Sequence, residues 1–84
     1  MAGTPFVALA VLRAAPGQRR RLRENLLGLV EPTRAEPAAL DYSLFESADE
    51  RGTFYMRESF SDEDGFERHR ASAHYQRFAA EAAS

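Results

Sequence analysis

The chain has 84 residues and a formal net charge of −2, with acidic and basic side chains interleaved along it. A chain of this length has room for one modest core, so we interpret residues 1–84 as a single domain. No basic patch stands out, which argues against nucleic acid or an anionic membrane as the main partner. Cysteine and lysine are both absent, which excludes disulfides, thiolate metal sites and lysine Schiff bases.

The longest apolar run covers residues 6–12 and is far shorter than the ~20 residues that span a bilayer. A signal peptide carries positive charge before its apolar stretch, whereas here the arginines at 13 and 19–21 follow it. We therefore interpret this run as a strand and expect a cytoplasmic protein.

The first half of the chain predicts a strand and then a helix. Residues 6–13 are rich in Val, Leu and Phe and are followed by the breaker Pro16-Gly17. From Gln18 to about Glu31 the apolar residues have helical spacing, at positions Leu22, Leu26 and Leu29. Pro32 is expected to kink or end this helix.

Two further strands are predicted at 40–46 and 53–60, where apolar and polar residues alternate. The turn residues between them indicate an antiparallel hairpin. If Tyr42 pairs with Glu58, one face of the hairpin carries Leu40, Tyr42, Leu44, Phe54, Met56, Glu58 and Phe60. We expect that face to meet the helices.

After the hairpin, Ser61 and Asp64 have the spacing of a capping box and predict a helix that starts there. Ser72 is a candidate second N-cap, so we expect a break near Ala71 followed by another helical segment. The predicted fold class is therefore α+β, with the element order of a ferredoxin-like antiparallel sheet covered by helices on one face. The last strand of that pattern is not visible.

In the predicted order, the motifs of the chain resemble those of the antibiotic biosynthesis monooxygenase (ABM) family of dimeric α+β barrel proteins. The matching residues are Pro16-Gly17, Thr33-Arg34-Ala35-Glu36-Pro37, Tyr42, Glu58, Phe66, His69, Ser72 and His74. Family members usually have glycine after the Glu-Pro, where this chain has Ala38, and usually continue into a further strand. Haem-degrading relatives have an asparagine and a haem-ligating histidine where this chain has Ala10 and Ala79, which argues against haem degradation.

Glu58 and His69 are the candidate catalytic residues. Glu58 lies on a row that otherwise faces the core, and a buried carboxylate needs a hydrogen bond or a cation. It either orients His69 as a base or forms a structural ion pair with an arginine such as Arg34 or Arg70. His69 follows Phe66 on one side of the helix, so its ring should point at the sheet.

His74 is interpreted as a residue at the rim of the site or as a packing residue. On an unbroken helix it would lie about 140° from His69, so the two converge only if the helix breaks near Ser72. An iron site formed by two histidines and a glutamate is conceivable from residue types, but this spacing argues against it. We expect no metal and no other cofactor.

Small side chains on the first strand, at Ala8 and Ala10, leave room for a pocket or simply admit close helix packing. The residues assigned to binding an aromatic substrate are Phe6, Ala10, Tyr42, Phe54, Met56, Phe60 and His74. The tyrosines could hydrogen-bond a phenol, although strand tyrosines more often serve packing.

The resemblance implies a cofactor-independent monooxygenase that oxidises a quinol, an anthrone or a related aromatic polyketide with dioxygen. A base would remove a phenolic or benzylic proton, and the resulting anion would itself reduce dioxygen. The alternatives are a non-catalytic small-molecule binding or accessory protein and an isomerase of small oxygenated metabolites, because fold does not fix activity.

A homodimer is also expected. If Phe6, Ala8 and Ala10 turn inward, the apolar residues between them must project from the other face of the sheet, joined by Phe45 and Tyr55. Two such faces packed across a two-fold axis would give the barrel of the family, with Arg57 and Asp41 paired at its rim.

Overall fold

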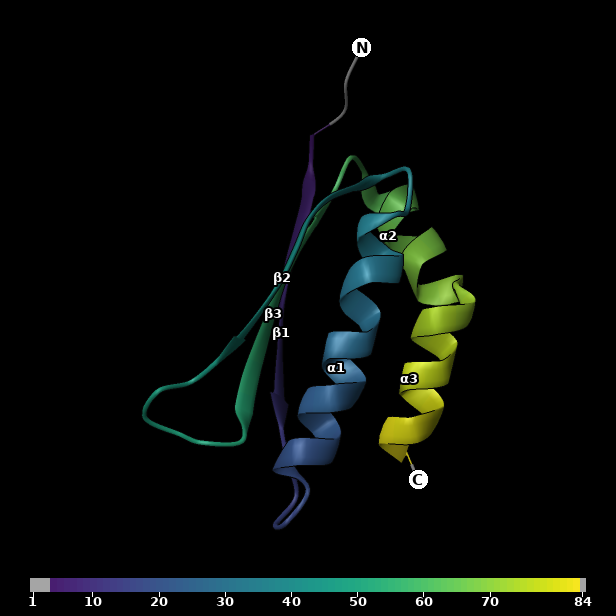
Figure 1. Ribbon diagram of the computed structural model, residues 1–84. Helices are drawn as coiled ribbons and strands as arrows, with labels where there is room; N and C mark the ends of the chain where they lie inside the picture. Colours follow the sequence, from purple (N-terminus) through teal and green to yellow (C-terminus); the bar gives the residue numbers. More distant parts are fainter. Residues whose placement is uncertain (1–3, 84) are drawn as a thin grey trace.

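An antiparallel sheet with its strands in the order β1-β3-β2 organises the protein. The computed structural model describes residues 4–83. Its elements are β1 (Phe6–Arg13), α1 (Arg19–Arg34), β2 (Ala39–Glu46), β3 (Thr53–Phe60), α2 (Glu63–Ala71) and α3 (Ala73–Ala83). The helices all lie on one side of the sheet, and α3 runs beside α1 (Figure 1). The α+β class and the ferredoxin-like arrangement are confirmed, and residues 4–83 contain no strand after α3.

Strand register decides which side chains reach the helix layer. On β3, Glu58 is paired with Ala8 of β1 on one side and with Tyr42 of β2 on the other. The predicted pairing of Tyr42 with Glu58 is therefore confirmed. Because side chains alternate along a strand, these three residues share the face that the helices cover.

Leu40 departs from the predicted face. The register of β2 against β3 shifts between Ala39 and Asp41, which leaves Leu40 as an extra residue in a bulge. Its side chain is 59% exposed, so the prediction that it faces the helices was wrong. The prediction assumed that side chains alternate between the two faces along the whole strand. One inserted residue interrupts that alternation and turns Leu40 away from the helices.

The helix ends also differ from expectation in two places. Helix α1 does not end at Pro32 but continues to Arg34. Helix α2 is capped by Asp62 rather than Ser61, because the Asp62 side chain accepts a hydrogen bond from the backbone N–H of Gly65. The predicted break is present at Ser72, which separates α2 from α3.

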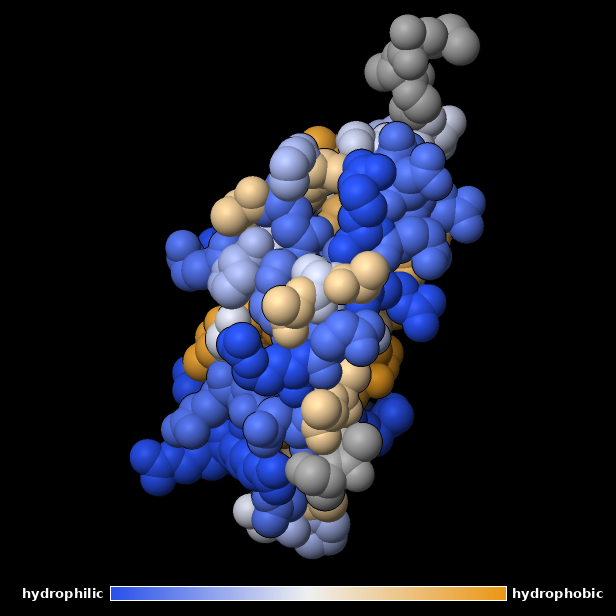
Figure 2. Space-filling view, turned by 90° about the vertical axis from the view of Figure 1, so that its right-hand side faces the viewer, coloured by the Kyte–Doolittle hydropathy of each residue, from blue (hydrophilic) through white to orange (hydrophobic). Residues whose placement is uncertain are grey.

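The core lies between the sheet and α1. Its central buried residues come from α1 and the hairpin strands, namely Leu26, Leu29, Tyr42, Phe54 and Met56. The outward surface of the helices is mostly hydrophilic (Figure 2). None of the described helices is long and apolar enough to cross a membrane.

The opposite face of the sheet is apolar and open. We call it the open face and define it by the exposed residues Val7, Leu9, Val11 and Phe45. Val7 and Leu9 are 65% and 63% exposed. On this face Arg57 donates a hydrogen bond to Asp41 at 2.9 Å, as expected from the sequence, and lies over the Phe45 ring.

Candidate active site

A cavity of about 330 Å³ lies between the sheet and the helices. Its walls are mostly apolar, and Ala8 and Ala10 of β1 contribute only methyl groups where larger side chains would fill the space. Aromatic walls come from Tyr42, Phe66, Tyr75 and Phe78. The small residues of β1 thus coincide with a cavity of the size that binds a small organic molecule.

Glu58 is the carboxyl group in this cavity. It is only 7% exposed, and burial raises its pKa from the ordinary value of 4.5 to about 7, with a further contribution from the negative charge of Glu36. The ion pair with Arg34 or Arg70 considered above is not formed: Arg34 donates to the backbone carbonyl of Tyr42, and Arg70 lies over the Phe66 ring. Glu58 can therefore exchange a proton near neutral pH.

Tyr42 is the nearest phenol on the sheet. Burial and the adjacent Glu58 raise the pKa of its hydroxyl well above the usual range. Tyr42 thus stays protonated and can act as a hydrogen-bond donor, not as a base.

His69 lies behind Glu58 and is fully buried. Its Nε2 atom is 3.8 Å from Glu58 Oε1 and has no hydrogen-bond partner, whereas its Nδ1 atom is 2.9 Å from Glu36 Oε2. The ring packs against Tyr42, Phe60 and Tyr75. His69 lies between two carboxyl groups, and its hydrogen bond to Glu36 is the contact that orients the ring.

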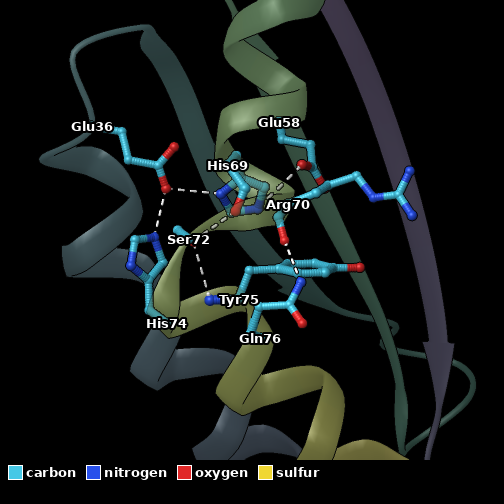
Figure 3. A network of polar contacts seen from close by, with 8 residues as sticks. All are labelled: Glu36, Glu58, His69, Arg70, Ser72, His74, Tyr75 and Gln76. Carbon is cyan, nitrogen blue, oxygen red and sulfur yellow. Dashed lines mark hydrogen bonds and ion pairs between the residues drawn. The ribbon is translucent and has the colours of Figure 1, made fainter.

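Glu36 joins the two histidines of the chain. Its Oε2 atom also lies 2.5 Å from His74 Nε2, so one carboxylate oxygen is shared by both rings (Figure 3). Sequence reasoning noted Glu36 only as part of a motif and did not assign it to the site. It precedes Pro37 in the turn between α1 and β2, far along the chain from both histidines.

The break at Ser72 brings the two histidines together. The hydroxyl of Ser72 donates to the carbonyl of His69 at 2.6 Å and accepts from the backbone N–H of Tyr75 at 3.2 Å. It therefore closes α2 and caps α3 at once. The rings of His69 and His74 have centroids 6.0 Å apart, which an unbroken helix would not allow.

Glu36, His69 and His74 are also the group that could hold a metal ion, since their ligand atoms lie within 4.8 Å of one another. The spacing argument against such a site does not apply here, because it assumed an unbroken helix. In the arrangement observed, however, both rings are hydrogen-bonded to one carboxylate oxygen. This geometry is that of a hydrogen-bonded network.

The residues predicted to bind substrate separate into two groups. Ala10, Tyr42 and Met56 border the cavity. Phe54 and Phe60 are buried outside its lining, Phe6 packs against Phe66, and His74 borders a different hollow between α1 and α3. Of the two candidate catalytic residues, Glu58 borders the cavity and His69 does not.

The fold and the enclosed carboxyl group define a small α+β protein with a cavity under its helices. Residues 5–81 match the family described as Antibiotic biosynthesis monooxygenase (ABM). The chain belongs to this family, as the resemblance indicated.

Individual relatives agree with this assignment. The Bacillus subtilis protein named "Putative monooxygenase YcnE" is 35% identical over 75 residues, which are 89% of this chain and 79% of that protein. The crystal structure of PA3566 from Pseudomonas aeruginosa superposes with a TM-score of 0.91 at 37% identity, covering 94% of this chain and 80% of the other. Rv0793 of Mycobacterium tuberculosis superposes with a TM-score of 0.87 at 34% identity, covering 92% and 78%.

Proposed function

We propose that this chain is a cofactor-independent monooxygenase that oxidises a quinol, an anthrone or a related aromatic polyketide with dioxygen. The observation that carries the proposal is the position of Glu58, a carboxyl group with a raised pKa on the wall of a mostly apolar cavity. Relatives named as monooxygenases support the reaction class.

In this proposal Glu58 is the base, and the His69 ring lies behind it, 3.8 Å away. This differs from the roles expected from the sequence, because only Glu58 borders the cavity. A carboxylate with a pKa near the working pH is suited to accept a proton and to return it later. The apolar wall keeps water away from the anion that forms, and the phenol of Tyr42 can donate a hydrogen bond to its oxygen.

With an anthrone as substrate, the reaction starts at the benzylic CH₂ group. Glu58 takes one proton from the benzylic CH₂, and the anion passes one electron to dioxygen. The radical pair combines into a C–O–O⁻ adduct, which takes a proton and then loses water as the second C–H bond breaks. The CH₂ group becomes C=O, one oxygen atom enters the product, and the other leaves as water.

Oxygen uptake with a panel of quinols and anthrones, measured in the presence of a chelator, tests the proposal. Glu58→Gln keeps the size of the side chain but removes the base, and we expect its kcat to fall by about 10²-fold or more. Glu50→Gln, a change of the same type on an exposed carboxylate of the hairpin turn, should leave the rate unchanged.

The outcomes separate the candidate functions. Uptake that depends on Glu58 and survives chelation supports the monooxygenase. Binding of the same compounds without oxygen uptake would favour the small-molecule binding protein, and conversion without oxygen uptake would favour the isomerase. Equal rates in the native chain and in Glu58→Gln would remove Glu58 from the mechanism.

A further inference from the structure

We propose that four side chains form a relay that carries protons between the cavity and solvent, in the order Glu58, His69, Glu36 and His74. The relay rests on the proposed function for its purpose, because a buried base on the wall of an apolar cavity must release the proton that it accepts. Its existence can be tested without any substrate.

The four groups alternate between carboxyl and imidazole, and each lies within 4 Å of the next, with hydrogen bonds at the two outer steps and none between Glu58 and His69 (Figure 3). From the cavity outward, the successive separations are 3.8 Å, 2.9 Å and 2.5 Å. From His69 outward the exposed fraction of the side chain increases, from 1% at His69 to 15% at Glu36 and 20% at His74, whereas Glu58 on the cavity wall is 9% exposed. The chain of groups thus begins in the cavity and ends at the surface.

The unpaired nitrogen of His69 is what a relay requires. A buried ring nitrogen without a partner is unusual unless it has a role, and this one faces Glu58. Because His69 Nδ1 is hydrogen-bonded to Glu36, that atom carries the proton in the neutral ring, which leaves Nε2 free to accept one.

One proton can then cross the relay from the cavity to the surface. The proton of Glu58 moves to His69 Nε2, and the Nδ1 proton of that ring moves to Glu36 Oε2. Glu36 Oε2 passes the proton that it shares with His74 Nε2 to that nitrogen, and the other nitrogen of His74, which points away from Glu36, releases its own proton to water. One proton enters and one leaves, and each ring is left in its other tautomer, so both rings must return to the starting tautomer before the next passage.

Other charged or titratable groups border the cavity but do not provide a second route. Arg70 cannot lose its proton, and the raised pKa of Tyr42 keeps its hydroxyl protonated. The phenol of Tyr75 packs edge-on against the His69 ring. Among the described residues, the histidine ring is therefore the proton acceptor behind Glu58.

The exchange of His69 ring N–H protons with water, measured by NMR, tests the relay directly. The chain has only two histidines, so His74→Ala assigns both rings. We expect Glu36→Gln and His74→Ala to slow this exchange about tenfold or more. Imidazole in the buffer should restore the rate in His74→Ala, where the partly exposed ring has been removed. Glu31→Gln, on an exposed residue of α1, is the matched control and should have no effect.

The sign of the effect distinguishes a relay from a structural network. If the two residues only stabilise the fold, their replacement loosens the site and makes exchange faster. Exchange that is unchanged or faster in both variants overturns the relay, as does a metal ion held stoichiometrically by Glu36 and the histidines. If the native chain takes up no oxygen with any substrate, the proposed function is wrong. That result leaves the relay standing, because the exchange measurement needs no turnover.

Discussion

Glu58 is a residue whose ionisation opposes folding. Its pKa is raised from 4.5 to about 7 by burial, so the folded protein binds this proton more tightly than the unfolded chain. The stabilisation from the neutral carboxyl is fully present below pH 4.5 and is lost as the pH rises through about 7. Above that pH the native chain carries a buried negative charge at position 58, whereas the Glu58→Gln variant carries none.

We therefore predict that Glu58→Gln is close to the native chain in stability at pH 4–5 and more stable at pH 8, by about 1–3 kcal/mol. Urea unfolding at the two pH values measures the difference. Glu50→Gln serves as the control, and we expect no such pH-dependent gain from it. A native chain more stable than Glu58→Gln at pH 8 would show that the carboxylate has a stabilising partner.

The cluster of Glu36, His69 and His74 also leads to a prediction about metal content. Since Glu36 Oε2 is hydrogen-bonded to both rings, we expect the purified protein to contain no stoichiometric transition metal. Elemental analysis and a visible spectrum check this, and the spectrum also reports flavin or haem. One metal per chain that disappears in His74→Ala would instead establish a metal centre.

The sequence could predict that Glu58 and His69 both face the layer between sheet and helices, because strand alternation and helical spacing fix which face each occupies. It could not predict that His69 is turned toward Glu36. That contact joins a turn to a helix 33 residues further on, and no periodicity relates the two. The only signal in the sequence was the motif that contains Glu36.

At the scale of elements, the close approach of α2 to the start of β2 depends on Gly65. A Cβ atom added at Gly65 would lie 2.6 Å from the Cβ of Ala38. Both atoms are fixed to the backbone, so neither can move aside without shifting an element. We infer that Gly65 provides the space that Ala38 occupies.

Gly65→Ala should therefore destabilise the protein, by about 1–3 kcal/mol, although alanine is the better helix former. Gly28→Ala on α1 is the matched control, because an added Cβ there meets nothing within 4 Å. We expect that control to gain up to about 1 kcal/mol. Adding Ala38→Gly to Gly65→Ala should recover much of the loss in thermal unfolding, and failure to do so would place the strain elsewhere.

Most element bounds could be predicted, because alternation and helical spacing are properties of neighbouring residues. Strands β1 and β3 and the break at Ser72 are where the pattern places them. The bulge at Leu40 and the extension of α1 past Pro32 were not predictable in the same way. Both depend on how the segment packs against the rest of the molecule.

The whole molecule has one hydrophilic side and one apolar side. The helices present mostly polar groups outward (Figure 2), whereas Val7, Leu9, Val11 and Phe45 are exposed on the open face. Contiguous apolar surface of this kind usually marks an interface. We propose that two copies pack open face to open face across a two-fold axis, which makes each face its own complement.

Light scattering at micromolar concentration should accordingly report a homodimer. Leu9→Asp places a charge on the open face and should dissociate or unfold it, whereas Leu27→Asp, at an exposed leucine of α1, should leave it intact. A strict monomer contradicts the proposal. Dissociation by the α1 variant alone would move the interface to the helices, and larger assemblies would indicate that the unpaired edge of β1 also forms contacts.

The break at Ser72 also bears on how the molecule moves. Helix α3 is joined to α2 through this one residue and packs mainly against α1, yet its residues Tyr75 and Phe78 form part of the cavity wall. A rotation of α3 about Ser72 would therefore move Tyr75 and Phe78 relative to the sheet and change the width of the cavity. Motions of this kind take microseconds to milliseconds. Ser72 is thus the single-residue junction on which the position of this part of the cavity wall depends.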